Sequence, residues 1–446
     1  MNKLQAGFAR TNITPMMGIE LVGYFFERPA EGVLDDIEIN ALALAVEEKR
    51  VVILSVDNEG LQKEVTADFR QQIVKETGLS MEAIYIHSTH SHTAPILKKD
   101  SEIDIEKEYY NFVRRKIVDV TKFALDDLKP AKMGYGIGKA PNISFVRRYR
   151  MKDGSAQTNP GIDNPNILEP LGKVDDNVYV LCFDRDDADN IVLVNFANHP
   201  DSVGGNMISA DWPGFTRRTV EKIIDGTKCL VLNGAQGDIN HVNIHPTGGY
   251  MNDMRIDFDG PRGYRHCEYL GRVVTGGVLQ AYDKVKYVDV ETLQYAQRTI
   301  HVASNMPKPE ELPEAHRIYN LHLEGKDDEL GYSGMMLTTV VAEARRMVML
   351  ENGPDAFDMD LSGIAIGNIV FVGIPGEPFA GIGYGVRESE DWDLVLVTCI
   401  TNGKHGYFPM KEAYDEGGYE SRSSRFKAGV AEYIMEECKE LMKELR

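Results

Sequence analysis

The chain has 446 residues, and its 49 basic side chains stand against 69 acidic ones, giving a formal net charge of −20. Hydrophobic residues make up 43% and charged residues 26%, which is typical of a globular protein with a core and excludes disorder of the whole chain. The acidic balance argues against nucleic acid and anionic membrane surfaces, because both require basic patches. No apolar run approaches the roughly 18 to 20 residues that span a bilayer.

The N-terminal segment and the cysteines bear on the cellular compartment. The opening residues MNKLQAGFARTNITP contain no apolar core of a secretory signal. The five cysteines are widely spaced and form no C-x-x-C pair, which favours reduced thiols over a disulfide framework or a cysteine zinc site. We therefore expect a cytoplasmic protein.

Short apolar runs alternate with longer amphipathic segments along the chain. The runs predict buried strands at Val51–Val56, Ala83–Ile86, Val178–Phe183, Ile191–Phe196, Cys229–Leu232, Ile364–Ile366, Ile369–Ile374 and Leu394–Thr398. The amphipathic segments predict helices at Glu64–Thr77, Glu106–Leu128, Gly214–Asp225, Arg265–Val285 and Ser424–Leu445. This alternation predicts an α/β fold with a largely parallel or mixed sheet flanked by helices.

Two segments interrupt the alternation. Gly134–Gly172 is rich in Gly, Pro and Asn and contains the basic stretch Arg147-Arg148-Tyr149-Arg150, so we expect a long functional loop. Residues 307–353 are charged and helical in pattern, and predict a helical insertion. No repeat or linker divides the chain, and we expect one catalytic domain over residues 1–446.

Polar clusters follow most of the predicted strands directly. They include Asp57 and Glu59, His87 to His92, Asn198-His199-Pro200, Asn233 to Asp238, Pro375-Gly376-Glu377-Pro378 and Asn402 to Tyr407. Open parallel sheets bind ligands in the crevice outside the carboxyl ends of their strands. These clusters therefore predict one shared site.

The histidines are the strongest indication of chemistry at that site. Imidazole and carboxylate are the usual ligands of a zinc ion that keeps a position open for water. On extended backbone His90 and His92 point to the same side, so one could bind metal and the other polarise a substrate. A histidine taken alone is more often structural than functional. His199 is a candidate for a functional role only because it follows a predicted strand.

Other candidates leave more than one interpretation open. Asp238, within Gly237-Asp238-Ile239-Asn240-His241, could be a metal ligand, part of an oxyanion site or a turn residue. Glu377 is more specific, because a carboxylate between two prolines after a buried strand has little structural purpose. Arg147 could bind an anionic or carbonyl group, or lie in a solvated loop.

Several motifs in order resemble the neutral/alkaline (non-lysosomal) ceramidase family. They are Asn12-Ile13-Thr14-Pro15, Thr89-His90-Ser91-His92-Thr93-Ala94-Pro95, Asn198-His199-Pro200, Asn233-Gly234-Ala235-Gln236-Gly237-Asp238, Pro375-Gly376-Glu377 and Gly406-Tyr407. The resemblance covers the catalytic domain, from about residue 5 to about residue 425.

The resemblance implies a zinc-dependent amidohydrolase. By motif, the zinc ligands would be His90, His199, Glu377 and Tyr407. His92 would contact the substrate carbonyl or its oxyanion, and Arg147 would belong to the active-site arginine segment of the family.

Two departures from the family pattern shape the expected reaction. Asn240 stands where ceramide-cleaving members have serine, and the chain ends in a charged helix where they carry an immunoglobulin-like domain. We therefore expect a small or lipid-like amide substrate and direct hydrolysis by metal-activated water, without an acyl-enzyme.

Two other functions remain open at this point. A metallophosphoesterase would hold two metal ions about 3.5 to 4 Å apart. A non-catalytic binding protein would keep the same fold without turnover.

Overall fold

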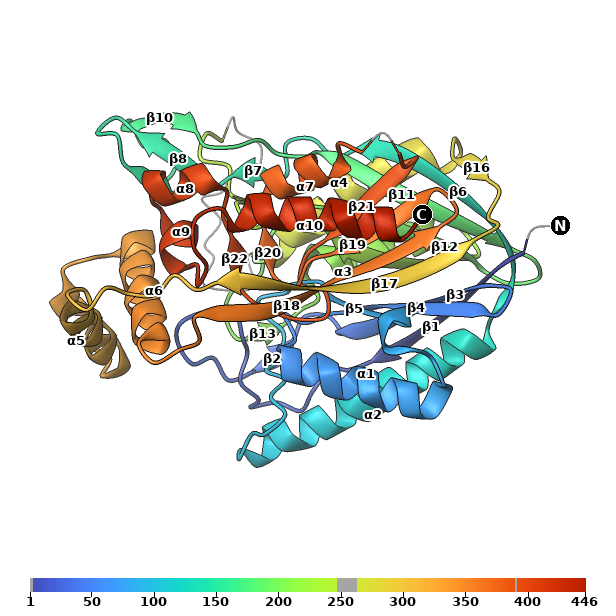
Figure 1. Ribbon diagram of the computed structural model, residues 1–446, viewed down its shortest axis with the longest axis horizontal. Coiled ribbons are helices and arrows are strands. Elements are labelled where there is room, and N and C mark those ends of the chain that lie inside the picture. The colour runs from blue at the N-terminus through green and yellow to red at the C-terminus, as the bar shows by residue number, and fades with distance from the viewer. Residues whose placement is uncertain (1–2, 247–262, 390) are drawn as a thin grey trace.

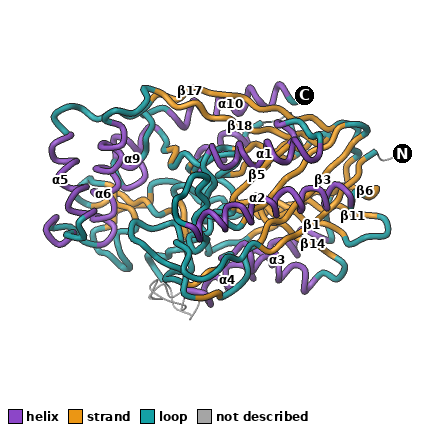
Figure 2. The backbone as a smooth tube through the Cα atoms, turned by 90° about the horizontal axis from the view of Figure 1, so that it is seen from below, coloured by secondary structure: helices purple, strands orange, loops and turns teal. Residues whose placement is uncertain are grey.

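The computed structural model describes residues 3–246, 263–389 and 391–446. Two β-sheets pack face to face, and helices cover the outer face of each sheet (Figure 1). The view from below shows α1 to α4 lying across the strands of the larger sheet (Figure 2). The fold is therefore a four-layer α/β/β/α arrangement, which confirms the predicted α/β class.

The larger sheet has nine strands, in the order β14-β12-β11-β6-β1-β3-β4-β5 with β16 beside β6. Its strands are β1 (Leu4–Asn12), β3 (Glu38–Val46), β4 (Lys49–Val56), β5 (Ile84–Ser88), β6 (Lys129–Lys139), β11 (Asn177–Arg185), β12 (Asn190–Phe196), β14 (Thr227–Asn233) and β16 (Lys286–Val288).

The smaller sheet has the order β17-β18-β19-β21. Its strands are β17 (Leu293–Ala303), β18 (Ala356–Ile366), β19 (Ile369–Gly373) and β21 (Leu394–Thr398). One buried cluster contains Leu42, Ile53 and Leu193 of the larger sheet together with Phe371 and Leu396 of the smaller one. This shared apolar core holds the two sheets together.

Helices pack on both outer faces. The larger sheet is covered by α1 (Lys63–Thr77) and α2 (Asp104–Asp126) over one half and by α3 (Asp211–Ile223) and α4 (Gly263–Tyr282) over the other. The smaller sheet is covered by α7 (Ala380–Arg387) and α10 (Val430–Glu444). The predicted helix from Ser424 begins later, at Val430, because Gly429 has a φ of +97° and cannot continue a helix.

The large sheet is mixed, and most neighbouring strands in both sheets are antiparallel. Parallel pairing is confined to β4/β5 and β12/β14 in the larger sheet and β19/β21 in the smaller one. Of the two predicted alternatives, mixed is therefore the correct one. The three parallel pairs are also the strands whose ends carry the predicted site clusters.

The prediction of a long loop over Gly134–Gly172 is wrong in its first part, because β6 continues to Lys139 at the centre of the larger sheet. Instead of marking a turn, Gly136 and Gly138 face α4, and Gly134 faces Val285 just after it. A Cβ at Gly138 would lie 1.9 Å from the carbonyl oxygen of Gly277, so only glycine permits this close packing. Short strands β7 (Phe145–Val146), β8 (Arg148–Met151), β9 (Ala156–Thr158) and β10 (Ile167–Pro170) follow.

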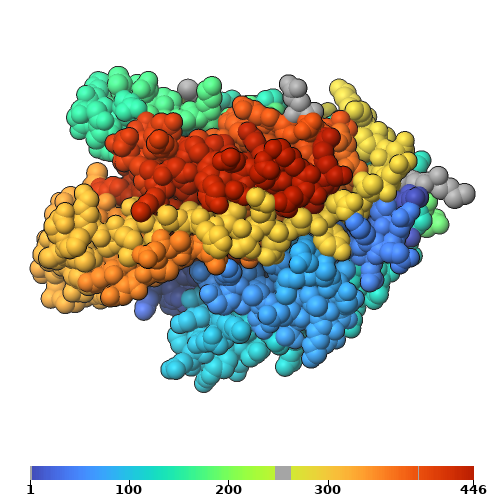
Figure 3. Space-filling view, in the orientation of Figure 1, coloured from blue at the N-terminus to red at the C-terminus, as the bar shows by residue number. Residues whose placement is uncertain are grey.

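The helices α5 (Leu312–Leu323) and α6 (Gly334–Leu350) pack on one another through their own apolar cluster, with the short helix η2 (Asp327–Leu330) between them. They form one end of the molecule, beside the C-terminal segment (Figures 1 and 3). That segment contains α8 (Lys411–Glu416) and α9 (Tyr419–Ser423), and α9 packs on α6.

The remaining described elements are a 3-10 turn and five short strands. They are η1 (Met81–Ala83), β2 (Gly32–Val33), β13 (Met207–Ile208), β15 (Ile239–Asn240), β20 (Glu377–Pro378) and β22 (Tyr407–Phe408) with β20 paired to β22. All five cysteines are buried and unpaired. Among the described residues, no helix is long and apolar enough to cross a membrane.

Candidate metal centre and the adjoining cavity

The candidate centre lies where the three parallel strand pairs end. His90 follows β5, His199 follows β12, and Glu377 follows β19. The carboxyl ends of these strands meet although they belong to two different sheets. His90, His92 and His199 form a group in which one ring nitrogen of each lies within 4.8 Å of those of the other two.

The His90 imidazole is held in one tautomer by the backbone. Its Nδ1 lies 2.5 Å from the carbonyl oxygen of Glu59, which can only accept, so Nδ1 carries the proton. The Nε2 of neutral His90 therefore presents a lone pair to the centre of the group. Burial opposes protonation, but the carboxylates of Glu377 and Glu59 outweigh it and raise the pKa of His90.

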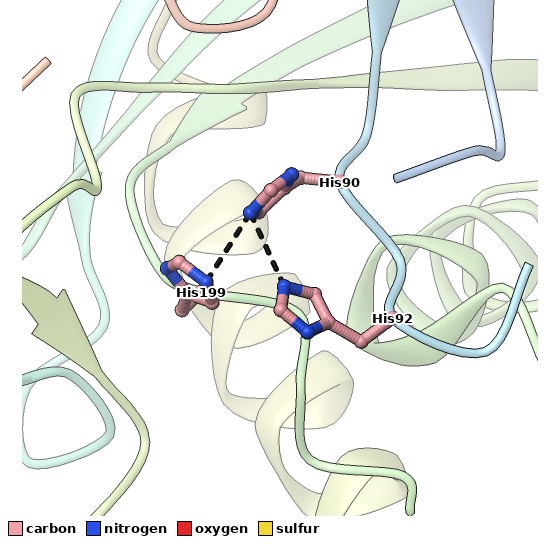
Figure 4. A group of neighbouring side chains, drawn as sticks. All are labelled: His90, His92 and His199. Atoms are coloured by element: carbon pink, nitrogen blue, oxygen red, sulfur yellow. Dashed lines mark hydrogen bonds between the residues drawn. The ribbon is translucent and has the colours of Figure 1, made fainter. Parts of the chain in front are cut away.

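The other two imidazoles face this Nε2. The Nε2 atoms of His92 and His199 each lie 3.2 Å from Nε2 of His90 (Figure 4). Both rings favour the neutral form: burial and the neighbouring His90 lower the pKa of His92 to about 4, and burial and Arg147 hold the pKa of His199 well below its ordinary value. Neutral imidazole is the form that binds metal.

The backbone that brings His92 to His90 differs from the expected extended strand. His90 has a φ of +76°, so the chain turns sharply between the two rings. The buried Arg28 holds the far side of this turn, donating hydrogen bonds to the carbonyl oxygens of His92, Gly205 and Val22. The prediction that His90 and His92 face one site is correct. The extended backbone assumed in that prediction is absent, because the chain turns at His90.

Glu377 adds a carboxylate to the imidazoles. Its Oε2 lies 3.3 Å from Nε2 of His90 and 3.9 Å from Nε2 of His199, and it accepts no hydrogen bond from the described residues. Burial alone would raise its pKa, but the histidines and Arg147 hold the pKa well below the usual range. A buried carboxylate without a hydrogen bond is costly unless a cation binds it.

These spacings fit a zinc ion. Zinc bonds to nitrogen and oxygen are about 2.0 to 2.2 Å long, so neighbouring ligand atoms of a tetrahedral site lie about 3.3 Å apart. The three atoms around Nε2 of His90 lie at 3.2, 3.2 and 3.3 Å, and Nε2 of His199 lies 3.9 Å from Oε2 of Glu377. The residues therefore fit the metal that the sequence motifs implied.

Tyr407 lies beside the centre, in register with Glu377 in the β20/β22 pair. The Arg147 guanidinium carbon lies 5.3 Å from the centroid of the Tyr407 ring, and the Tyr419 ring lies 5.5 Å from it. Burial and the charge of Glu377 hold the pKa of Tyr407 well above its ordinary value. A cation at the centre would have to lower that pKa before the phenol could become a ligand.

Arg147 and Asp238 lie behind the centre, and neither is among the residues lining the adjoining cavity. Arg147 forms a buried ion pair with Glu420, with 2.6 Å between Nε and Oε1, and donates to the carbonyl oxygen of Gly237. Asp238 accepts a hydrogen bond from the backbone N–H of Ala380, at the start of α7. Arg147 is thus buried and paired, not part of a solvated loop.

Asn240 has both ends of its amide engaged. Its nitrogen donates to Asn159, and its oxygen accepts from the backbone N–H of Val242. These contacts are those of a turn residue. The nearby Ser91 hydroxyl donates to the carbonyl oxygen of Ser209.

His87, the first histidine of the strand-end trio, is separate from the centre. Its Nδ1 donates to the carbonyl oxygen of Cys399 and its Nε2 accepts from the backbone N–H of Asn233. It therefore joins β5 to the end of β14 and to the segment after β21 as a structural histidine, and burial lowers its pKa to about 3.

A cavity of about 420 Å³ opens beside the centre. His90, His92, Glu377 and Tyr407 form part of its wall. The remainder comes from the loop around Tyr24, the segments after β4 and β21, α6, and α9 with the residues just after it. The Tyr24 ring lies 5.9 Å from the His92 ring and under the Arg28 guanidinium. A substrate in this cavity would meet the imidazoles and the carboxylate together.

Sequence reasoning did not identify Arg28, Asp201 or Tyr419 as part of this region. Asp201 is 2.9 Å from Nδ1 of His241, and its position two residues after His199 was the available signal. Arg28 and Tyr419 have no such signal, because neither directly follows a predicted strand or a histidine of the group.

Comparisons with known proteins agree on the fold. A neutral ceramidase from Pseudomonas aeruginosa has a TM-score of 0.74 and 16% identity, covering 98% of this chain and 74% of that one. A ceramidase complexed with C2 also has a TM-score of 0.74, with 15% identity over 100% of this chain and 76% of the other. No family model and no curated protein sequence match the chain. The chain has a ceramidase-like fold.

Proposed function

We propose that this protein is a zinc-dependent amidohydrolase that cleaves the C–N bond of a small or lipid-like amide. The observation that carries the proposal is the spacing of His90, His92, His199 and Glu377 in the wall of the cavity. The amide class follows from the ceramidases that share the fold. When bound, zinc lowers the pKa of a water molecule to about 7 and polarises a carbonyl group.

We assign the metal ligands as His90, His199, Glu377 and Tyr407, as the motif resemblance implies. The hydrogen bond from His90 to Glu59 fixes the ring that would lie at the middle of this set. His92 is assigned to the substrate carbonyl, where its Nε2 would donate a hydrogen bond to the developing oxyanion.

We assign Arg147 and Asp238 the role of holding the candidate ligands in position, from the side of the centre that does not line the cavity. Arg147 places a positive charge between Tyr407 and Glu420, which favours an ionised Tyr407. Asp238 fixes the start of α7, next to the Glu377 segment.

Water is the proposed attacking group. Asn240 cannot act as a nucleophile, and its amide is engaged at both ends. Direct attack by water leaves no covalent adduct, so intact-mass spectrometry of the rapidly quenched enzyme should show the unmodified chain during turnover. An adduct on a serine would overturn this part of the proposal.

The decisive experiment combines metal analysis with turnover of N-acyl amides. The purified protein should contain one zinc ion per chain, and His90→Ala and His199→Ala should each lose both the metal and hydrolysis of the amide. His87→Gln is the matched control, because His87 lies in the same cluster of the sequence but binds backbone groups only. Two metals per chain would favour a phosphoesterase, and no metal would favour a binding protein.

A further inference from the structure

The cavity beside the centre carries an excess of positive charge within an acidic protein. Four of its lining side chains are cationic and three are acidic, although the chain as a whole has a net charge of −20. The excess would be greater with a metal ion bound. Charge of one sign in a cleft concentrates ligands of the opposite sign.

Two of the three acidic side chains in the wall already have a partner, and the third belongs to the candidate centre. Glu20 accepts a hydrogen bond from the backbone N–H of Arg28, and Glu59 forms an ion pair with Lys404. Glu377 lies against His90 in the candidate centre. None of these carboxylates lies within ion-pair distance of Arg345 or Arg425.

The two arginines have no counter-charge among the described residues. Arg345 is exposed on α6, next to the cavity mouth, and forms neither an ion pair nor a hydrogen bond there. Arg425 is half-buried and stacks over Phe357, with 5.6 Å from its guanidinium carbon to the ring centroid. Burial and the positive charge of Arg345 lower the pKa of Arg425, so the two guanidinium groups repel each other.

Neighbouring arginines show that this lack of partners is local. Arg422, three residues before Arg425, forms an ion pair with Glu343, and Arg346, next to Arg345, donates to the carbonyl oxygens of Arg422 and Asn305. The same two segments therefore provide ion-pair or hydrogen-bond partners for their structural arginines. Arg345 and Arg425 are left with free donors facing the cavity.

We propose that the substrate carries an anionic group, such as a carboxylate, that binds between Arg345 and Arg425 while its amide lies at the candidate centre. Guanidinium groups bind carboxylates with paired, charge-assisted hydrogen bonds. The apolar part of such a substrate would pack against Leu21, Phe25 and Met349, which line the same cavity. This inference rests on the proposed amide hydrolysis for the orientation of the ligand, and binding of the anion can be measured without turnover.

The test compares acids with their neutral esters in equilibrium binding to the full chain as purified. N-octanoylglycine carries its carboxylate on the amine side of the amide, and N-octylsuccinamic acid carries it on the acyl side. The methyl ester of each removes the charge and keeps the apolar chain. Calorimetric titration should show at least one acid binding about 10- to 100-fold more tightly than its ester, since a hydrogen bond to a charged group contributes on that order.

The variants Arg345→Gln and Arg425→Gln should each remove most of that preference while leaving ester binding unchanged. Arg425→Lys keeps the charge and should retain part of it, which separates loss of charge from loss of packing on Phe357. Arg317→Gln is the matched control, because Arg317 lies on the neighbouring α5 and pairs with Glu314 away from the cavity.

The outcomes separate this inference from the proposed function. Equal affinity for acids and esters, or a preference that survives in both Gln variants, would overturn the anion site even if amides are cleaved. A preference that disappears in the variants supports the site even if no amide is cleaved, and the amidohydrolase proposal alone would then fail.

Discussion

The chemical interpretation depends mainly on His90 and His92, which have different structural roles. His90 has a fixed tautomer and lies at the middle of the group, with three possible ligand atoms within 3.3 Å of its Nε2. His92 lies at the edge of the group and also faces the cavity. Its Nε2 is close enough to be a metal ligand or a donor to the substrate.

Substitution of His92 distinguishes these two roles. As a donor to the oxyanion, His92→Ala should keep its zinc and lose about 100- to 1,000-fold in turnover, the usual effect of removing one such donor. Zinc content and kcat are measured on the same preparation. Loss of zinc would make His92 a ligand in place of Tyr407, and full zinc with near-normal kcat would make it structural.

Asp238 makes the free energy of unfolding depend on pH in a way that does not involve the metal. Burial and the charge of Glu420 raise its pKa to about 6, although Ala380 N–H and two arginines oppose the shift. The folded state favours the protonated form, so Asp238 makes its full contribution to stability below the unfolded pKa of about 4. That contribution is lost as the pH rises through the folded pKa of about 6. The loss between pH 4 and pH 8 should be about 3 kcal/mol.

Asp238→Asn should remove this part of the pH dependence. The measurement is the urea midpoint at pH 4.5, 6 and 8 for both proteins, with the exposed Asp225→Asn as the control that should retain the wild-type slope. If the wild type and Asp238→Asn differ by the same amount at every pH, the carboxyl group does not titrate in this range.

At the scale of whole elements, the sequence pattern predicted the strands that lead to the site. β12 and β21 were predicted to within one residue, because Ile191–Phe196 and Leu394–Thr398 are apolar and bounded by polar clusters. β1, β3 and β17 were missed. β3 contains an apolar run at Ala41–Val46, but that run is mostly alanine and leucine, which favour helices, and β17 is largely half-exposed and shows no strict alternation.

Site residues that follow a short apolar strand were the ones predicted from the sequence. His90, His199 and Glu377 each follow a short apolar strand, and that local pattern is readable without the fold. The hydrogen bonds of the Arg28 guanidinium go only to backbone carbonyl oxygens around the site, from segments up to 177 positions away. Nothing in the residues near Arg28 encodes those contacts, since the tertiary structure creates them.

The packing of β6 on α4 can be tested directly. Gly138→Ala should destabilise the protein by about 1 to 3 kcal/mol, because the new Cβ would meet the backbone at Gly277 and neither element can move freely. Gly276→Ala, one position along α4, is the control: its Cβ would meet nothing within 4 Å, and alanine favours a helix by up to about 1 kcal/mol. Equal urea midpoints for the two variants would contradict this account of the glycines.

At the scale of the whole molecule, the candidate centre joins the two sheets. His90 and His199 follow strands of the larger sheet, whereas Glu377 follows a strand of the smaller one. The apolar core between the sheets already holds them together, so the ligands would reach their positions before a metal binds. A metal ion at this point would add a second connection at one end of the interface.

Metal removal should therefore lower the thermal stability of the entire chain and not of one loop. A metal that binds only the folded state stabilises it by about 4 kcal/mol at 1,000 times its Kd. Unfolding entropy scales with chain length, so for 446 residues this amounts to about 4 °C in Tm. Scanning calorimetry with and without a chelator should show one transition that shifts as a whole, with no shift in His199→Ala. A zinc-loaded protein whose Tm is unchanged by chelation, or in which only a minor early transition moves, would show that the metal does not connect the sheets.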